Sequence, residues 1–339
     1  MTQPILQIEQ LRVSFRIEGE YYAAVDDVTL AVRPNEVLAI VGESGCGKSA
    51  LAHAITGLHD PKRTKLEGSV VFAGRNLLSL SSHELNQIRG KSIGMIFQDP
   101  LTALNPLMTV GRQIEEGLDY HTTLSASQKR QRTLELLHRV GIPNPQQTYD
   151  RYPHELSGGM RQRIMIAMAI ASDPVLIVAD EPTTALDVTI QTQIMMLLKE
   201  LQQQLNTGII LITHNLGIVA EMADRVAVMY GGEIVELAEV EELFADPKHP
   251  YTRSLLQSMP TRQAHKEKLH VIQGMVPSLA KLPRTGCRFK DRMSWIEASE
   301  HEAHPVLREF KPEHWVRCTC YRNFRFPQGA QGEISDGTT

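Results

Sequence analysis

This 339-residue chain carries the octapeptide Gly42-Glu43-Ser44-Gly45-Cys46-Gly47-Lys48-Ser49. A glycine, four variable residues and then Gly-Lys-Ser form the pattern of a phosphate-binding loop. The apolar run 37–41 before it predicts a buried parallel strand, and the run 49–56 after it predicts a helix that ends at Gly57. A glycine-rich loop between a strand and a helix can curl round an anion, because its backbone N–H groups and the helix N-terminus point inward.

Two side chains of the octapeptide have expected roles of their own. Lys48 can reach the β- and γ-phosphate oxygens of a nucleotide as a mobile positive charge. The Ser49 hydroxyl can ligate the Mg²⁺ ion that bridges these phosphates. The sequence therefore predicts a nucleotide site, and the predicted contacts come from Gly42, Glu43, Ser44, Gly45, Cys46, Gly47, Lys48, Ser49 and Ala50.

Length and composition narrow the class of protein. A hydrophobic fraction of 42% and a charged fraction of 22% are ordinary for a globular protein, and the length favours two domains. The net charge of −4, without a long basic run, does not favour a nucleic-acid partner. No apolar run is long enough to span a bilayer and no secretion signal opens the chain, so we expect a cytosolic protein. The four cysteines are too few for a disulfide scaffold and are expected to be reduced.

Polar side chains follow three of the predicted buried strands. Because the carboxyl ends of parallel strands meet at one edge of a sheet, these side chains are expected to line the ligand-binding edge. They are Gln98 after the run 93–97, Asp180 and Glu181 after the run 175–179, and His214 after the run 209–213.

The adjacent carboxylates Asp180 and Glu181 have a specific expected chemistry. Beside a triphosphate they would repel each other unless a cation lies there, so Asp180 is assigned to Mg²⁺. Glu181 can then polarise the attacking water. His214, at the same edge, is expected to contact the γ-phosphate, although a lone histidine is usually structural.

A second candidate anion site lies at Leu156-Ser157-Gly158-Gly159-Met160. Ser157 can cap a helix that continues towards Ala171, and two glycines at a helix N-terminus leave room for an anion. One nucleotide needs only one such loop. The stretch is therefore either an ordinary helix cap or a contact to the phosphate of a neighbouring molecule.

The remaining pattern predicts a mixed α/β fold. Residues 6–32 predict antiparallel strands around a polar turn at 18–20, residues 107–155 predict a helical insertion, and residues 226–235 predict a hairpin. Phe15 in the first strand either stacks on a purine base or is a half-buried strand residue, and its spacing does not separate the two interpretations.

Taken together, these residues resemble the nucleotide-binding subunits of ABC transporters, over about residues 5–260. The stretch 156–160 is similar to that family's signature motif, with Met160 where Gln is commonest. The resemblance implies a P-loop NTPase core with a parallel sheet, an antiparallel β subdomain and a helical signature subdomain at about 100–172. It also implies a small C-terminal extension at 261–326, and the Gly- and Gln-rich residues 327–339 are expected to be disordered.

The resemblance also implies cofactors and roles. ATP and Mg²⁺ are expected, with Phe15 stacking on the base. Asp180 matches the metal ligand, Glu181 the catalytic base and His214 the switch histidine. The remaining matches are Gln98 to a loop that touches both Mg²⁺ and the membrane partner, Ser157, Gly158 and Gly159 to the signature motif, and Asp187 to a loop that crosses the dimer.

Three further stretches resemble the dipeptide and oligopeptide importers: 97–106, 249–252 and 286–289. The resemblance implies a paralogous second ATPase subunit, or else a homodimer, with two integral membrane permease subunits and an extracytoplasmic substrate-binding protein. It places the chain at the cytoplasmic face of the inner membrane. Nickel and opine importers share much of this pattern and are the alternative. Soluble cassette ATPases of chromosomes or ribosomes are a further alternative, but they carry a coiled coil or two cassettes in one chain.

The C-terminal cysteines depart from the family pattern. Related subunits often carry four cysteines here, which in some hold an iron–sulfur cluster, but Met293 and Glu300 stand at the two intermediate positions. Cluster ligation normally takes four cysteines, so we predict no cluster. The favoured interpretation is ordinary thiols. The alternative is a zinc site formed by Cys287, Cys318, Cys320 and one of His301, His304 or His314.

Overall fold

The computed structural model describes residues 3–184, 186–259, 272–293 and 296–323. The predicted disordered tail, 327–339, and the first part of the predicted extension, 261–271, lie outside this described part. No helix among the described residues is both long and apolar enough to cross a membrane.

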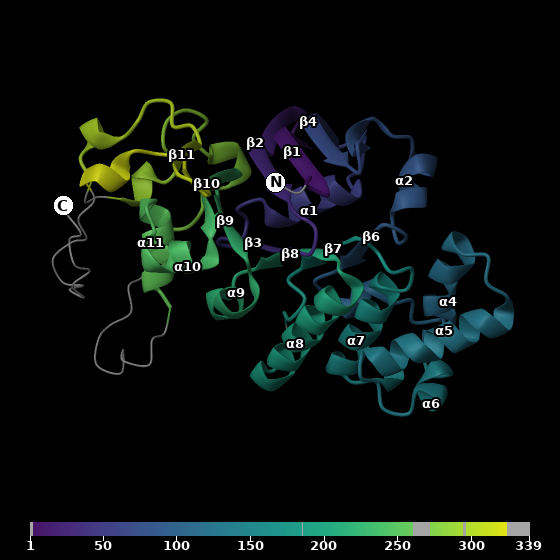
Figure 1. Ribbon diagram of the computed structural model, residues 1–339. Coiled ribbons are helices and arrows are strands. Elements are labelled where there is room, and N and C mark those ends of the chain that lie inside the picture. The colour runs from purple at the N-terminus through teal and green to yellow at the C-terminus, as the bar shows by residue number, and fades with distance from the viewer. Residues whose placement is uncertain (1–2, 185, 260–271, 294–295, 324–339) are drawn as a thin grey trace.

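A mixed sheet runs across the middle of the molecule (Figure 1). Its parallel part has the order β6-β7-β8-β3-β9, and β10, β12 and β11 continue it in antiparallel fashion among the described residues. The parallel strands are β6 (Ile93–Ile96), β7 (Leu176–Asp180), β8 (Gly208–Thr213), β3 (Val37–Val41) and β9 (Arg225–Tyr230). The antiparallel strands are β10 (Glu233–Glu239), β12 (His314–Val316) and β11 (Arg308–Lys311).

The parallel strands form because both of their faces are buried, as their continuous apolar runs predict. In β3 every residue is buried, and the side chains alternate between two cores. Leu38 and Ile40 pack with the antiparallel subdomain, whereas Val37, Ala39 and Val41 pack with the helices. The sheet is thus the wall between the two cores, which fixes the edge from which the phosphate-binding loop emerges.

The predicted antiparallel subdomain and hairpin are confirmed. A second sheet has the strand order β2-β1-β4-β5 and pairs the first two strands around the expected turn at 18–20. The hairpin between β9 and β10 pairs Tyr230 with Glu233. The strands of the second sheet are β1 (Leu6–Ile17), β2 (Glu20–Val32), β4 (Thr64–Phe72) and β5 (Arg75–Asn76). The single-turn helix η1 (Leu77–Ser79) and the helix α2 (Ser82–Ile88) follow them.

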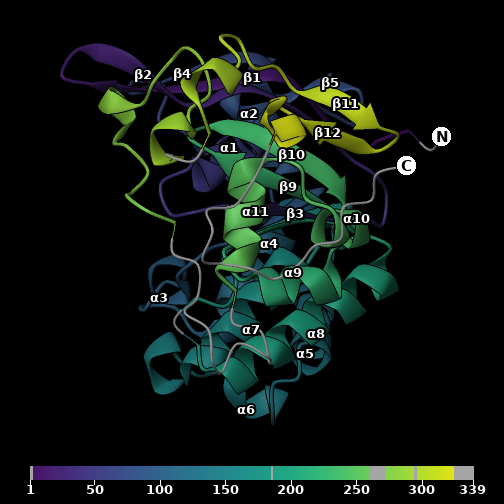
Figure 2. The same ribbon diagram turned by 90° about the vertical axis from the view of Figure 1, so that its left-hand side faces the viewer.

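The helical insertion is also present, and it lies at the opposite end of the molecule from the C-terminal extension (Figures 1 and 2). Its helices cover the core that contains Ile114, Leu137 and Ile164. They are α3 (Pro100–Ala103), α4 (Val110–His121), α5 (Ala126–Arg139), α6 (Pro145–Tyr149), η2 (Pro153–Glu155) and α7 (Gly158–Ala169).

The C-terminal extension joins the central sheet. Strand β12 pairs with β10 through Glu236 opposite Val316 and Leu237 opposite Trp315. Backbone hydrogen bonds therefore fasten the extension to the cassette. The remaining helices are α1 (Lys48–Thr56), α8 (Val188–Leu205), α9 (Leu216–Met222), α10 (Val240–Ala245) and α11 (Pro250–Gln257). Short turns η4 (Leu279–Lys281), η5 (Lys290–Arg292), η6 (Ala298–Glu300) and η7 (Cys320–Asn323) lie in the extension.

Candidate nucleotide-binding and hydrolysis site

The phosphate-binding loop follows β3 directly and ends at α1, as the sequence predicts. Two of its glycines allow the neighbouring backbone to approach closely. A Cβ atom on Gly42 would lie 2.2 Å from the Met229 carbonyl oxygen, and one on Gly47 would lie 2.4 Å from that of Ala24. Gly47 also has a φ of 108° and caps α1 without a side-chain hydrogen bond. The first amide groups of α1 are therefore left for an anion.

Lys48 folds back onto the loop from which it starts. Its Nζ donates hydrogen bonds to the carbonyl oxygens of Gly42 at 2.8 Å and Glu43 at 3.0 Å, and it lies 3.7 Å from the Cys46 sulfur. The residue is only 5% exposed, although Ser44, Gly45 and Ser49 of the same loop are exposed. The ammonium group is thus held among loop atoms, where a phosphate oxygen can replace a carbonyl as its partner.

Ser49 and Asp180 come together at the sheet edge. The Ser49 Oγ and Asp180 Oδ1 atoms are 3.3 Å apart, although the residues are distant in sequence. Asp180 is 4% exposed, and burial raises the pKa of its carboxyl group. A hydroxyl and a carboxylate side by side fit Mg²⁺, which usually takes one or two carboxylates and completes its shell with phosphate oxygens and water.

Glu181 is the meeting point of the predicted catalytic residues. Its Oε2 accepts hydrogen bonds from Gln98 Nε2 at 3.1 Å and from the Thr184 hydroxyl at 2.9 Å. Its Oε1 lies 3.4 Å from His214 Nδ1. Gln98, Glu181 and His214 follow β6, β7 and β8, so three strand ends supply one cluster.

The backbone of Glu181 is held in an uncommon conformation. Its φ is 46°, in the left-handed region that residues with a side chain rarely adopt. The Glu181 N–H donates to the Ile212 carbonyl oxygen at 2.9 Å, which fixes the turn after β7 to the neighbouring strand. Such strain persists where the surroundings enforce it, and it is concentrated at functional sites.

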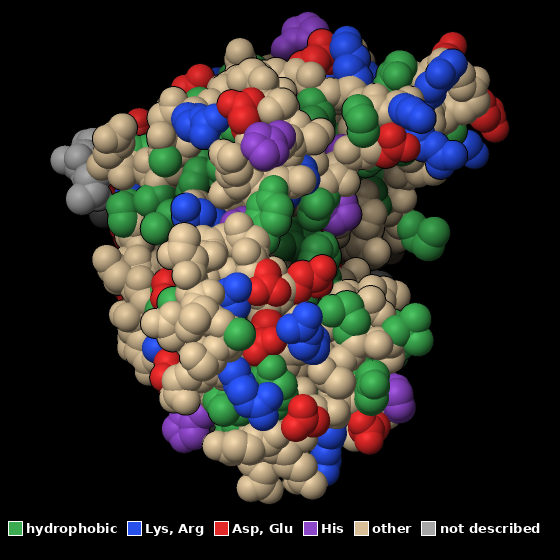
Figure 3. All heavy atoms as spheres, turned by 90° about the vertical axis from the view of Figure 1, so that its right-hand side faces the viewer, with side chains coloured by type: hydrophobic (Ala, Val, Ile, Leu, Met, Phe, Trp, Pro, Cys, Tyr) green, Lys and Arg blue, Asp and Glu red, His purple; other side chains and the backbone are tan. Residues whose placement is uncertain are grey.

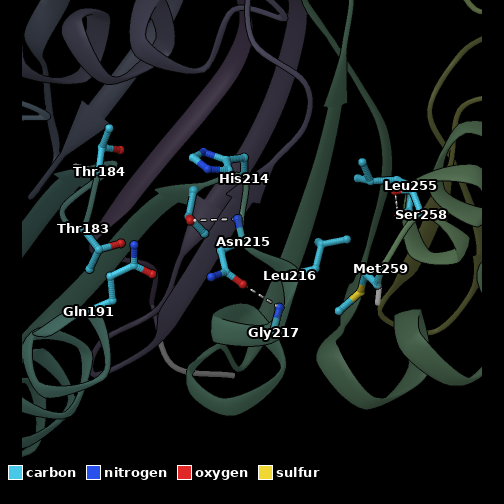
Figure 4. Close-up of a pocket in the computed structure, with 11 residues that line it drawn as sticks. Thr183, Thr184, Gln191, His214, Asn215, Leu216, Gly217, Leu255, Ser258 and Met259 are labelled. Carbon is cyan, nitrogen blue, oxygen red and sulfur yellow. Dashed lines mark hydrogen bonds between the residues drawn. The ribbon is translucent and has the colours of Figure 1, made fainter. Parts of the chain in front are cut away.

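A pocket of about 390 Å³ lies beside this cluster (Figure 4). Thr184 and His214 line it together with Asn215, and the end of α11 and the residues after it close the other side. Figure 4 shows Leu255, Ser258 and Met259 across the pocket from His214. The side chain of His214 is 65% exposed.

The predicted second anion site begins a helix, as expected. The Ser157 Oγ accepts a hydrogen bond from the Met160 N–H at 3.4 Å and caps α7. Asp187 caps α8 in the same way, with its Oδ1 accepting from the Ile190 N–H at 3.0 Å. A Cβ atom on Gly159 would lie 3.1 Å from Ile190, so the starts of the two helices are neighbours. Both caps work within one chain, and the alternative of a contact to a neighbouring molecule stays open.

Phe15 is half-buried in β1, and His59 connects it to Ala50. Its ring makes an edge contact with His59, with ring centres 5.4 Å apart. His59 Nε2 in turn hydrogen-bonds to the Ala50 carbonyl oxygen at 2.8 Å. Both interpretations of Phe15 therefore fit this position.

Sequence reasoning missed four residues of this region. Thr184 could have been found from its position three residues after Glu181, because residues at this spacing meet across a turn. His59, Tyr251 and Arg292 carry no local signal that connects them to the loop, and Tyr251 and Arg292 both bind Glu43. Tyr251 takes the Glu43 amide N–H, so this amide is not free for a phosphate in the structure.

The C-terminal cysteines are buried. Burial raises the pKa of Cys287 to about 12, and the hydrogen bond with Cys320, together with burial, raises that of Cys318, so both thiols are protonated at neutral pH. Cys320 Sγ lies 3.7 Å from His301 Nδ1. In the described ranges no group of three or more His, Cys, Asp or Glu residues is placed to hold a metal ion, which does not support the zinc alternative. The absence of an iron–sulfur cluster stays a prediction.

Comparison with known proteins gives the family. The model of the ABC transporter family matches residues 25–184, and that of the oligopeptide/dipeptide transporter C-terminal region matches residues 235–294. The oligopeptide transport ATP-binding protein OppD of Lactococcus lactis subsp. cremoris is 50% identical over 327 residues, which is 96% of this chain and 97% of the relative. OppD of Bacillus subtilis is 48% identical, over 92% of this chain and 88% of the relative. A putative peptide import ATP-binding protein of Brucella abortus is 47% identical, over 90% and 92%.

Solved structures agree with this result. The ATP-binding cassette MJ0796, described as a dimer in a post-hydrolysis state with ADP and Pi, has a TM-score of 0.63 and 30% identity, over 69% of this chain and 98% of the cassette. The predicted fold class, a P-loop NTPase core with added β and helical subdomains, is confirmed. The chain therefore belongs to the ATP-hydrolysing cassettes of the ABC transporter family, among the oligopeptide-transport ATP-binding proteins.

Proposed function

We propose that this chain powers the import of di- or oligopeptides, and that Glu181 is the base of its ATPase reaction. The observation that carries the assignment is the convergence of Gln98, Thr184 and His214 on the Glu181 carboxylate. Ser49 and Asp180 lie at the same sheet edge. In this proposal the edge of the sheet offers Glu181 to the attacking water and the pair Ser49 and Asp180 to Mg²⁺.

The reaction proposed is an in-line displacement at the γ-phosphorus. Glu181 orients a water molecule and takes its proton as the water oxygen bonds to phosphorus, and the bond to the β–γ bridging oxygen breaks to release ADP. Lys48 and the loop amides hold the β- and γ-phosphate oxygens. Bound Mg²⁺ would neutralise charge on these oxygens, and Ser49, Asp180 and Gln98 are the residues that would hold it. His214 would contact the γ-phosphate from the strand β8 side.

A second cassette completes the site in this proposal. Ser157, Gly158 and Gly159 of one chain would face the ATP held by Lys48 of the other, and Asp187 would cross between the two. The exposure of Ser157, Gly158 and Asp187 leaves them available for this contact. The second cassette is proposed to be a paralogous ATPase chain, and the similar cassette MJ0796 is dimeric.

The membrane partner would dock beside Gln98. A pocket of about 240 Å³, lined by Leu58, Phe97, Leu104 and other apolar side chains, lies between the α1 end and α7. Figure 3 shows hydrophobic side chains in the hollow between the two lobes on this side of the molecule. Nucleotide-driven movement of Gln98 would reach a partner in this hollow directly. The complete assembly proposed has two membrane permease subunits and an extracytoplasmic substrate-binding protein, with this chain at the cytoplasmic face of the inner membrane.

The test is to purify the tagged full chain from native membranes and identify its companions by mass spectrometry. A second ATPase, permease chains and a solute-binding protein are expected. The purified assembly in liposomes should hydrolyse ATP faster when its binding protein carries an oligopeptide. Stimulation by nickel or an opine instead would replace the cargo assignment, and companions from ribosomes or chromosomes would overturn the transport proposal.

A further inference from the structure

The C-terminal extension reaches into the phosphate-binding loop through Arg292. Arg292 Nη1 donates to Glu43 Oε2 at 2.6 Å, and Nη2 donates to Glu43 Oε1 at 3.1 Å. This is the two-pronged arrangement of guanidinium and carboxylate that fixes both groups geometrically. Glu43 is the second residue of the octapeptide, and Arg292 lies at the end of η5 in the extension.

The rest of the Arg292 fork is anchored within the extension. Its Nε donates to the Gln273 carbonyl oxygen at 2.7 Å, and its Nη2 donates to that of Gly274 at 3.1 Å. The guanidinium carbon also lies 5.7 Å from the ring centre of Phe289 and 5.8 Å from that of Tyr230. The Arg292 side chain is 6% exposed and the Glu43 side chain is 28% exposed, so the ion pair is partly buried and solvent weakens it less than a fully exposed surface pair.

Glu43 is held at its backbone as well as at its side chain. Its N–H donates to the Tyr251 hydroxyl at 2.9 Å, and its carbonyl oxygen accepts from Lys48 Nζ at 3.0 Å. Tyr251 is fully buried and packs against Tyr230 and Phe289, with ring centres 4.6 and 5.2 Å away. The residue whose carbonyl oxygen accepts from the Lys48 ammonium is therefore held by Tyr251 of α11 and by Arg292 of the extension.

We propose that Arg292 is a positioning residue for ATP binding, through which the C-terminal extension fixes the Glu43 peptide and so the phosphate-binding loop. The proposal rests on the proposed function in one respect, namely that this loop holds ATP phosphates. Without Arg292 the nucleotide itself must order the loop when it binds. The free energy that this ordering costs lowers the affinity for ATP. The proposed chemistry at Glu181 does not involve Arg292. The turnover rate at saturating ATP should therefore be unchanged.

The experiment compares the full chain with the Arg292→Gln, Arg292→Lys and Arg308→Gln variants. Arg308→Gln is the matched control, because it breaks an ion pair of the same extension, with Glu302 at 2.7 Å, that does not touch the loop. Binding of a fluorescent ATP analogue and thermal unfolding are measured for each chain by itself, and ATPase kinetics are measured for each in the assembled transporter. Arg292→Gln should weaken binding and raise the KM for ATP about tenfold, within the usual range of coupling between sites, with kcat retained. Arg292→Lys should be intermediate, because it keeps the charge but not the fork.

A double-mutant cycle with Glu43→Gln separates positioning from general stability. If Arg292 acts through Glu43, the double variant should bind ATP no more weakly than the worse single variant. Additive losses, or a lower unfolding temperature with unchanged ATP affinity, would overturn the inference. If Arg292→Gln does not fold, Arg292→Lys decides the question by the same two readouts. A wild-type chain that binds no ATP would instead refute the proposed function.

Discussion

Gln98 Nε2 donates a hydrogen bond to Glu181 Oε2 at 3.1 Å and so joins the ends of β6 and β7 at one point of the sheet edge. The contact links a residue beside the apolar hollow to the proposed catalytic base. Movement of either strand end should therefore alter the position of the other.

Glu181→Gln should retain ATP binding and lose ATP turnover. The amide has nearly the same shape but takes no proton from water, and loss of a general base lowers kcat by about 10²–10⁴-fold. Turnover is measured by phosphate release, and binding by calorimetry. Glu200→Gln, an exposed change on α8, is the control and should behave as wild type. Normal phosphate release by Glu181→Gln would show that the base lies elsewhere.

Ser157→Ala separates a helix cap from a contact across the dimer. Loss of the cap on α7 should cost about 1 kcal/mol of unfolding free energy in either case. Ser125→Ala, which removes the cap of α5, is the control for this cost. We expect Ser157→Ala alone to lower ATP turnover in the assembled transporter, while ATP binding by the single chain is unchanged. Equal turnover in the two variants would make Ser157 an ordinary cap.

Phe15→Leu tests stacking on the base. Aromatic stacking contributes about 1–3 kcal/mol per base, so ATP affinity should fall roughly tenfold. Inorganic tripolyphosphate has no base, and its affinity should not change. Calorimetric titration of both ligands measures the difference. A parallel loss for both would mean that Phe15 only supports β1 beside the loop.

Asp180→Asn should stabilise the free chain and abolish its magnesium-dependent activity. Burial raises the folded-state pKa of this carboxyl above its unfolded value. The folded state then binds more protons between the two pKa values, so stability falls as pH rises through this window, and the full cost is present above the folded-state pKa. Asparagine cannot ionise and removes that cost.

Urea denaturation without nucleotide measures this effect. The stability gain of Asp180→Asn should be greatest above the folded-state pKa of the buried carboxyl and should shrink as the pH falls through this pKa. Ser49→Ala, which removes the neighbouring hydroxyl, should not give this pH-dependent gain. A less stable Asp180→Asn at pH 7 would mean that the hydrogen bond with Ser49 outweighs burial of the charge.

Local features of the sequence determined much of the site. The strand, octapeptide and helix around Lys48 are contiguous, so a single pattern defines both structure and chemistry. Gln98, Asp180 and His214 could be placed on one edge because each lies at the carboxyl end of a strand of a parallel sheet, and such strands end on the same side. The antiparallel pair 6–32 and the hairpin 226–235 likewise connect neighbours in the chain, where turn residues and alternation carry the signal.

Only the tertiary structure decided which side chains meet. The pairing of Arg292 with Glu43, the ring of His59 against Phe15 and the addition of β12 to β10 join segments that no short pattern relates. Such contacts follow from how two faces pack, and packing is set by the whole set of buried side chains rather than by any local run. The sequence thus determined what chemistry the loop can perform, while long-range packing decided what holds the loop in place.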